Sequence, residues 1–308
     1  MTLLEIANDR LRLVFAPTVG GRLISLTVDG RELLWRNPAL LDAGLKVVSP
    51  ISTWPADDGT LATWTNLGGS KSWPAPQGWS SPSEWAGPPD AVLDAGEYTW
   101  SESASSDGLR LVLSSADDPR TGLRIERRFD IPNSGLGFTQ TLVLTNTSNS
   151  PIRWAPWEVC QVDLSEGAAD ADTAITVTVD GTHPPINLGD YHGTLTVRCA
   201  DGRTEIPIQD VIAKRGFADA NGSVAWHGAY GEGLELRFEP VDGADYPDSG
   251  SLVEVWMQTP MPEPLPSLGD FRVDARLAEL EVLGPLVDLA PGDRTELVLD
   301  WIAHPPTR

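Results

Sequence analysis

The sequence predicts an all-β protein in which residues 1–308 form a single domain of mainly antiparallel sheet. Two observations support this prediction. First, 26 prolines and 29 glycines disfavour helix and favour frequent turns. Second, short segments that alternate apolar and polar residues recur roughly every 10 to 15 residues, separated by turn-forming residues such as Asp-Gly and Asn-Ser-Gly. A hydrophobic content of 41% is sufficient for a large core.

The N-terminal part predicts short strands joined by tight turns. Residues 11–15 and 22–28 alternate as strands do, with a turn at 17–21 between them. Asp29-Gly30 is a strong hairpin signal, and residues 32–35 complete that hairpin.

Residues 36 to about 100 form a loop-rich, Trp-rich insertion in this prediction. Half of the chain's 12 tryptophans lie here: Trp54, Trp64, Trp73, Trp79, Trp85 and Trp100. Within residues 66–79, Gly68 and Gly69 disfavour helix, while Pro74 and Pro76 fix φ and remove backbone donors. We therefore expect residues 66–79 to form a loop that either binds a ligand or packs as a lid on the fold.

Strand patterns resume after the insertion. Strands are predicted at 98–102, 109–115, 123–131, 138–146, 153–163, 174–179, 195–198, 234–239, 252–258, 277–283 and 295–301. Residues 206–214 are the one stretch whose pattern allows a helical turn. Convincing helix signals are otherwise nearly absent.

The balance of acidic and basic residues indicates which classes of binding partner to expect. The chain has 22 basic and 44 acidic residues and a net charge of −22, which disfavours nucleic acid and anionic membrane surfaces. No apolar run is long enough to span a bilayer, and the N-terminus lacks a signal-peptide pattern. We therefore expect a cytoplasmic protein in which Cys160 and Cys199 are buried free thiols, with a disulfide between them as the alternative. The oligomeric state is not predicted.

Both ends of the chain resemble one known superfamily. Residues 8–26 resemble the start of galactose mutarotase-like (aldose 1-epimerase-like) proteins, and so does the close, where a Pro-Gly-Asp turn at 291–293 leads into a last alternating strand. The middle resembles a bacterial branch of that superfamily, the domain-of-unknown-function family DUF4380. This likeness rests on residues 68–77, 154–159, 214–216 and 278–285.

The resemblance implies a β-supersandwich of two large antiparallel sheets with a concave face for a carbohydrate. In mutarotases a histidine protonates the ring oxygen and a glutamate removes the anomeric hydroxyl proton. The matching glutamate here is Glu281, with Glu279 as the competing choice. None of the four histidines lies in a matching motif. The acid would then be Lys71, Lys214 or Glu158.

The residue types themselves indicate how a sugar would be held. Trp73 and Trp79 are suited to stacking on a pyranose face, with burial of the loop's own indoles as the alternative. Lys71 and Lys214 are two of only three lysines, and each adjoins glycine-containing sequence. The alternative for each is a solvated surface lysine.

The acidic candidates follow from strand geometry. Glu279 and Glu281 are two residues apart, so on a strand they share a face, and close packing of two acids raises the pKa of one. An exposed polar face is the alternative. Glu158, between Trp157 and Val159, is expected to pair with a cation such as Arg22 or Lys71, as a structural ion pair or as a ligand contact.

The remaining ligand-binding candidates are Gln77, Trp157 and Arg22, the last of which is also consistent with a structural role near the site. His183 and His192 lack a third partner at a metal-binding spacing, so no metal is predicted. No phosphate-loop, dinucleotide or zinc signature is present, so no cofactor is predicted.

We therefore expect a carbohydrate-binding protein that takes a small sugar or an oligosaccharide. The reaction expected of it, if it is an enzyme, is aldose 1-epimerisation with a non-standard acid. The alternatives are a non-catalytic sugar-binding or sensing module, and a polysaccharide lyase or glycoside hydrolase on a similar sandwich.

Overall fold

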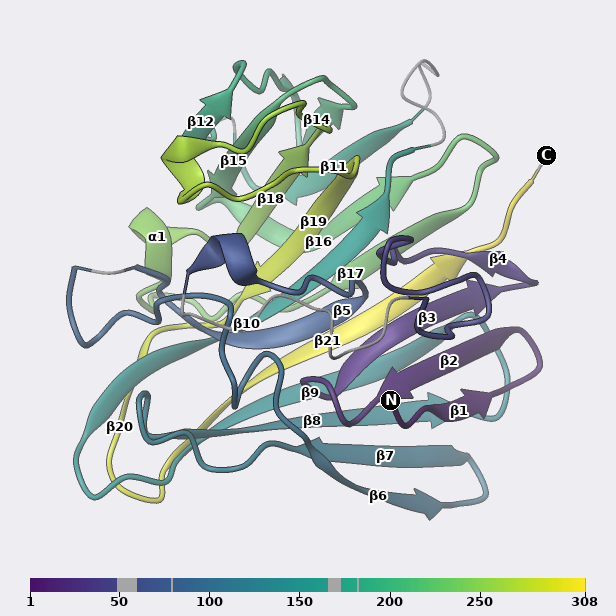
Figure 1. Cartoon of the computed structure of the whole chain (residues 1–308), viewed down its shortest axis with the longest axis vertical. Helices are drawn as coiled ribbons and strands as arrows, with labels where there is room; N and C mark the ends of the chain where they lie inside the picture. The colour runs from purple at the N-terminus through teal and green to yellow at the C-terminus, as the bar shows by residue number, and fades with distance from the viewer. Residues whose placement is uncertain (49–59, 79, 166–172, 182, 308) are drawn as a thin grey trace.

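The computed structural model describes residues 1–48, 60–78, 80–165, 173–181 and 183–307. These residues form two large sheets whose neighbouring strands run antiparallel (Figure 1). The prediction of an all-β fold is therefore confirmed. The helical content of the described residues is limited to the short turn α1 (Pro247–Gly250) and 3₁₀ turns at Leu61–Thr63 and Pro266–Leu268.

The first sheet carries the cavity described below. In spatial order its strands are β1 (Leu4–Ala7), β2 (Leu11–Ala16), β3 (Arg22–Val28), β5 (Ser70–Ala75), β10 (Ile152–Asp163), β19 (Leu277–Leu283), β18 (Val253–Gln258), β15 (Ile212–Phe217) and β12 (Ile186–His192). The short strands β4 (Arg31–Glu32) and β20 (Val287–Leu289) pair with β3 and β10 respectively. In Figure 1, β10 curves across the middle of the molecule.

The second sheet packs against the inner face of the first. Its order is β13 (Arg198–Ala200), β14 (Arg203–Pro207), β11 (Ala174–Val179), β16 (Ala220–His227), β17 (Gly233–Arg237), β21 (Arg294–His304), β9 (Gly137–Asn146), β8 (Leu123–Pro132), β7 (Gly108–Ser114) and β6 (Thr99–Ala104). Strand β10 lies against β9 and β21. One large hydrophobic cluster fills the space between the sheets, and it includes Leu280 and Val282 of β19.

A polar network is also buried between the sheets. Glu158 of β10 accepts a bond from Arg127 Nη2 of β8 at 2.9 Å and one from Gln140 Nε2 of β9 at 2.8 Å. Ser70 and Ser72 of β5 donate their hydroxyls to the same carboxylate. Because the side chains of Arg127 and Glu158 are fully buried, the charges are paired and hydrogen-bonded as burial requires.

The largest difference from the predicted elements is β5. Residues 70–75 form a strand inside the first sheet, where we predicted a loop. Pro74 lies opposite Pro156 of β10, and because neither has an N–H, this pair occupies a non-hydrogen-bonded position of the ladder. On the other side of β5, β3 pairs only through Leu23 opposite Ser70. Pro74 therefore removes no ladder hydrogen bond, which is why a proline is tolerated here.

Three smaller predictions are also corrected. Residues 206–214 contain the end of β14 and the start of β15, and no helical turn, because their apolar residues are buried in a sheet pattern. Residues 195–197 precede β13 and are not in a strand. Both cysteines are free, but only Cys160 is buried, and Cys199 is exposed on the sheet-edge strand β13. Among the described residues, no helix has the length and apolar character needed to cross a membrane.

Candidate functional site

A cavity of about 260 Å³ lies on the face of the first sheet that points away from the second sheet. Its strand residues come from six adjacent strands: β5, β10, β19, β18, β15 and β12. Residues outside the sheet also line it, including Leu61 in the 3₁₀ turn Leu61–Thr63, Trp64 directly after that turn, and Phe271. The lining residues are Leu61, Trp64, Asn66, Trp73, Gln77, Pro88, Trp157, Gln161, Leu188, Tyr191, Lys214, Asp248, Glu254, Trp256, Gln258, Leu268, Phe271, Glu279 and Glu281.

Strand register explains why these side chains meet. Side chains alternate between the two faces of a strand, so residues at every second position face the cavity. On β10 these include Trp157 and Gln161, while Glu158 points the other way into the core. Glu281 lies directly opposite Glu254 of β18, so the two carboxylates share the cavity face.

A buried cation links these two carboxylates. Lys214 Nζ of β15 lies 2.5 Å from Glu254 Oε2 and 2.9 Å from Glu281 Oε2. Trp157 Nε1 donates to Glu281 Oε2 at 2.9 Å, and the Lys214 ammonium lies 4.7 Å from the Trp157 ring centroid. The other oxygen of Glu281, Oε1, is buried and has no hydrogen-bond partner. Glu281 therefore has one carboxylate oxygen held in place and one left for a ligand.

Burial and mutual repulsion shift the acidity of this pair. Burial, opposed only in part by Lys214, raises the pKa of Glu281 to about 7. Burial also raises the pKa of Glu254 to about 8, and repulsion from Glu281 and Asp248 adds to the effect. Burial alone would lower the pKa of Lys214, but attraction to both carboxylates outweighs it and raises that pKa. Lys214 therefore stays protonated at neutral pH, where the two carboxyl groups share about one proton between them.

A second ion pair lies beside the first. Lys71 Nζ of β5 is 3.1 Å from Glu279 Oε1, and it sits 4.9 Å from the Trp73 ring centroid and 5.4 Å from that of Trp64. Burial lowers the pKa of Lys71, opposed by its attraction to Glu279. Gln161 Nε2 donates to the same Glu279 oxygen at 2.7 Å, while Gln161 Oε1 is buried without a partner. Because Nε2 is the donor to Glu279, the atom of the Gln161 amide without a partner is the acceptor Oε1.

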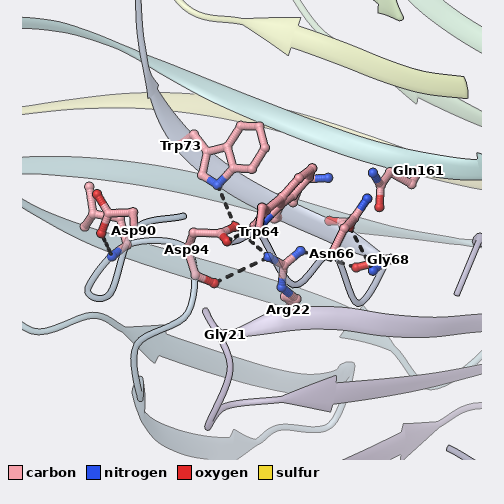
Figure 2. A network of polar contacts seen from close by, with 12 residues as sticks. Gly21, Arg22, Trp64, Asn66, Gly68, Trp73, Asp90, Asp94 and Gln161 are labelled. Atoms are coloured by element: carbon pink, nitrogen blue, oxygen red, sulfur yellow. Dashed lines mark hydrogen bonds and ion pairs between the residues drawn. The ribbon is translucent and has the colours of Figure 1, made fainter. Parts of the chain in front are cut away.

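Asp94 holds two of the aromatic walls from below (Figure 2). Its carboxylate accepts Trp64 Nε1 at 2.8 Å, Trp73 Nε1 at 3.1 Å and Arg22 Nη2 at 2.5 Å. Arg22 also donates to Gly68 O at 3.3 Å. The side chains of Arg22 and Asp94 are almost fully buried, so this pair fixes the indoles from beneath the cavity.

Aromatic rings form the rest of the cavity wall. Trp73 packs on Trp157, with centroids 5.2 Å apart, and Trp64 packs on Phe271 at 6.1 Å. On the other side, Tyr191 lies 5.6 Å from Trp256. Apolar ring faces above polar strand residues suit a ligand that has both C–H surfaces and hydrogen-bonding groups.

The cavity brings together six of the residues selected from the sequence. Trp73, Gln77, Trp157, Lys214, Glu279 and Glu281 line it. Lys71 lies beside it, bound to Glu279. Glu158 and Arg22 lie elsewhere: Glu158 faces the core and pairs with Arg127, and Arg22 pairs with Asp94. Trp79 lies outside the described residues.

Sequence reasoning missed three residues that matter for the cavity. Glu254 had a usable signal, because alternation in 253–258 places it on one face with Trp256 and Gln258. Gln161 had the same kind of signal on β10. Asp94 had none, since it comes from an irregular loop.

Two classes of chemical group are missing from the described cavity. All four histidines lie in the described part of the chain, and none lines the cavity. No group of three or more His, Cys, Asp or Glu side chains that could hold a metal ion occurs within the described residues. The acid–base groups among the described lining residues are the carboxyl groups, the Lys214 ammonium and the Tyr191 phenol.

Comparison with known proteins gives the fold a name. No family model and no curated protein matches the chain. Among solved structures, it is similar to a candidate aldose 1-epimerase from Escherichia coli K12, at 18% identity and a TM-score of 0.61, over 98% of each chain. It is also similar to a galactose mutarotase-like protein from Lactobacillus casei ATCC 334, at 12% identity and a TM-score of 0.58, over 98% of this chain and 100% of that one.

A TPR-domain containing protein from Parabacteroides distasonis ATCC 8503 matches at 14% identity and a TM-score of 0.60, over 98% of this chain. This chain spans about half of that protein, 47% of its length. At these identities the likeness concerns the fold. The two-sheet architecture is that of galactose mutarotase-like proteins, as we expected.

Proposed function

We propose that this protein binds a sugar in the cavity and catalyses proton transfer at the anomeric carbon, as an aldose 1-epimerase does. The observation that carries this proposal is Glu281. It is a fully buried carboxylate with one oxygen held by Lys214 and Trp157 and the other unpartnered. Its pKa, raised to about 7, suits a base that works at neutral pH.

Glu254 is the acid in this proposal, in the role that a histidine fills in mutarotases. The hydroxyl and the ring oxygen of an aldose are bonded to the same carbon, so two adjacent groups can serve both. Glu281 removes the proton of the anomeric hydroxyl while the protonated Glu254 delivers one to the ring oxygen. The bond between the anomeric carbon and the ring oxygen breaks, leaving an open-chain aldehyde. The pair keeps its total charge, and reclosure on the other face of the aldehyde inverts the anomer.

Binding without catalysis is the second candidate function. It is favoured by the lack of a cavity histidine in the described chain and by the tight hold of Lys214 on both carboxylates. Lys214 stabilises the ionised forms and so opposes proton exchange between them.

One experiment separates the two functions. Freshly dissolved α-anomers of glucose and galactose are followed by polarimetry with the native protein and with Glu281→Gln, and saturation-transfer NMR on the same samples detects binding. Faster anomer exchange that is lost in Glu281→Gln supports the epimerase. Binding with no acceleration supports the module that only binds, and absence of binding across a panel of neutral and charged sugars rejects both.

Three further assignments belong to this proposal. We place the chain beside the DUF4380 family, because the string at 68–77 that suggested this family contributes β5 and Trp73 to the cavity. We also treat residues 1–308 as one domain. A cytoplasmic location is proposed from the two free cysteines.

A further inference from the structure

We infer that the cavity selects a sugar that carries a protonated amino group, with Gln161 Oε1 and the Glu279 carboxylate as the acceptors for that ammonium. This inference rests on the proposed sugar site and names its substrate class. It follows from the charge in the cavity, from buried acceptors in the lining that have no hydrogen-bond partner, and from the way both lysines are already bound.

The charge in the cavity is negative. Four carboxyl groups line it, from Asp248, Glu254, Glu279 and Glu281. Lys214 is the one lysine among the described lining residues, and Lys71 lies beside Glu279. With all four carboxyl groups ionised the excess is two negative charges, and the proton that the Glu254–Glu281 pair retains at neutral pH reduces it to about one. Burying net charge is costly unless a counter-charge is supplied. A cationic ligand supplies that counter-charge, and the net charge of −22 on the chain attracts it from a distance.

The unpartnered atoms are acceptors. Gln161 is 1% exposed and its Oε1 has no hydrogen-bond partner, as is also true of Oε1 of the fully buried Glu281. A buried acceptor left without a donor costs free energy, so the site favours a ligand with donors at these positions. With Glu281 Oε1 facing the anomeric hydroxyl, Gln161 Oε1 and Glu279 are the acceptors for a donor on a neighbouring carbon. An ammonium donates up to three hydrogen bonds and accepts none.

Both lysines are committed to protein carboxylates, which disfavours an anionic ligand. Lys214 forms ion pairs with Glu254 and Glu281. Lys71 forms an ion pair with Glu279, and its ammonium lies near the indole rings of Trp64 and Trp73. A carboxylate or phosphate on the sugar would have to break one of these pairs or face the acids directly. The expected order of affinity is therefore amino sugar, then neutral sugar, then acidic sugar.

Proton release provides an independent signature of this binding mode. The pKa values of Glu254 and Glu281 lie near neutrality because of burial and mutual repulsion, so the pair retains a proton at neutral pH. Besides Lys214 and Asp248, the charged groups facing the pair are Glu279 and Lys71. At pH 6.5, below the pKa of Glu281, an ammonium bound nearby favours the ionised form of Glu281 and releases its proton, while Glu254, with the higher pKa, keeps the proton that the proposed acid step needs.

Isothermal titration calorimetry at pH 6.5 tests the inference with D-glucosamine, D-glucose and D-glucuronate, and with the same three members of the galactose series. We expect the amino sugar to bind about tenfold more tightly than the neutral one, the difference that one charge-assisted hydrogen bond contributes. The measured heat should depend on the ionisation enthalpy of the buffer, since a proton is released. Equal or tighter binding of the neutral sugar overturns the inference and leaves the sugar site standing. Absence of binding by all six sugars overturns the proposed function as well.

A matched pair of variants localises the effect. Glu279→Gln removes one charge from the cavity with little change of shape, and it should lower the ratio of glucosamine to glucose affinity about tenfold. Asp117→Asn removes one charge from an exposed pair with Arg124, outside the cavity, and should leave that ratio unchanged. An unchanged ratio in Glu279→Gln, or an equal fall in both variants, contradicts the assignment. The ligand series on the native protein remains decisive if the first variant does not fold.

Discussion

Replacing Asp94 with alanine should lower the free energy of unfolding by about 3–5 kcal/mol, because the change leaves a buried guanidinium without its counter-charge. The Arg22 and Asp94 side chains are 1% and 2% exposed, and Arg22 Nη2 lies 2.5 Å from Asp94 Oδ1. Without the Asp94 carboxylate, Arg22 keeps only backbone carbonyls as acceptors, at 3.3 and 3.5 Å. The indole N–H groups of Trp64 and Trp73 also lose their acceptor. These penalties overlap, so the total loss stays within that range.

Urea unfolding followed by far-ultraviolet circular dichroism measures this loss directly. Asp117→Ala is the matched control, since it breaks an exposed pair and should cost no more than about 1 kcal/mol. The double variant Arg22→Met with Asp94→Leu should recover most of the loss, because apolar replacement of a whole buried pair is often close to neutral. A loss below about 1 kcal/mol in Asp94→Ala, or a double variant as unstable as the single one, would refute this reasoning.

Four further predictions concern acidity, backbone strain and the buried core. Anomer exchange should be fastest between about pH 7 and 8, where Glu281 is ionised and Glu254 protonated, and a polarimetric pH profile checks this. These raised pKa values make the folded state bind more protons than the unfolded state. The stability that the pair contributes is therefore present at low pH and lost as the pH rises through 7 to 8. Urea titrations at several pH values should show that Glu281→Gln flattens this dependence. Gly69→Ala should cost at least about 2 kcal/mol of stability, since φ is +77° and a Cβ would lie 2.4 Å from a backbone oxygen. The control Gly135→Ala, at φ +104° with open space around it, should cost about 1 kcal/mol. Equal losses of Tm in the two variants would contradict this prediction. Glu158→Gln should lower stability by about 3–5 kcal/mol without changing sugar affinity, because its carboxylate faces the core, and a selective loss of affinity would show that it contacts the ligand.

Local patterns predicted many of the strands well. The segments 22–28, 174–179 and 277–283 agree with β3, β11 and β19 residue for residue. In these segments, alternation and bounding turns agree with the tertiary environment. The sequence also placed Glu279 and Glu281 on one face of a strand, and both line the cavity.

Local patterns were misleading where a neighbouring strand changed the requirement. The prolines and glycines of 66–79 favour a loop, yet residues 70–75 form a strand that pairs with β10. The register makes this possible, because Pro74 lies opposite Pro156 and so removes no ladder hydrogen bond. The same limit applies to Glu158. Its apolar neighbours indicate a paired carboxylate, but its partner Arg127 belongs to the other sheet, and no local pattern connects the two residues.

The amino-acid sequence by itself determined an all-β chain, the face shared by Glu279 and Glu281, and a net charge of −22. These properties depend on side-chain periodicity, turn chemistry and charge, which act over a few residues or over the whole composition. Only the tertiary structure decided which charges meet. Strand order places β15, β18 and β19 side by side, so Lys214 binds Glu254 and Glu281 although these residues are far apart in the chain. That pairing depends on sheet topology and register, which no local pattern encodes.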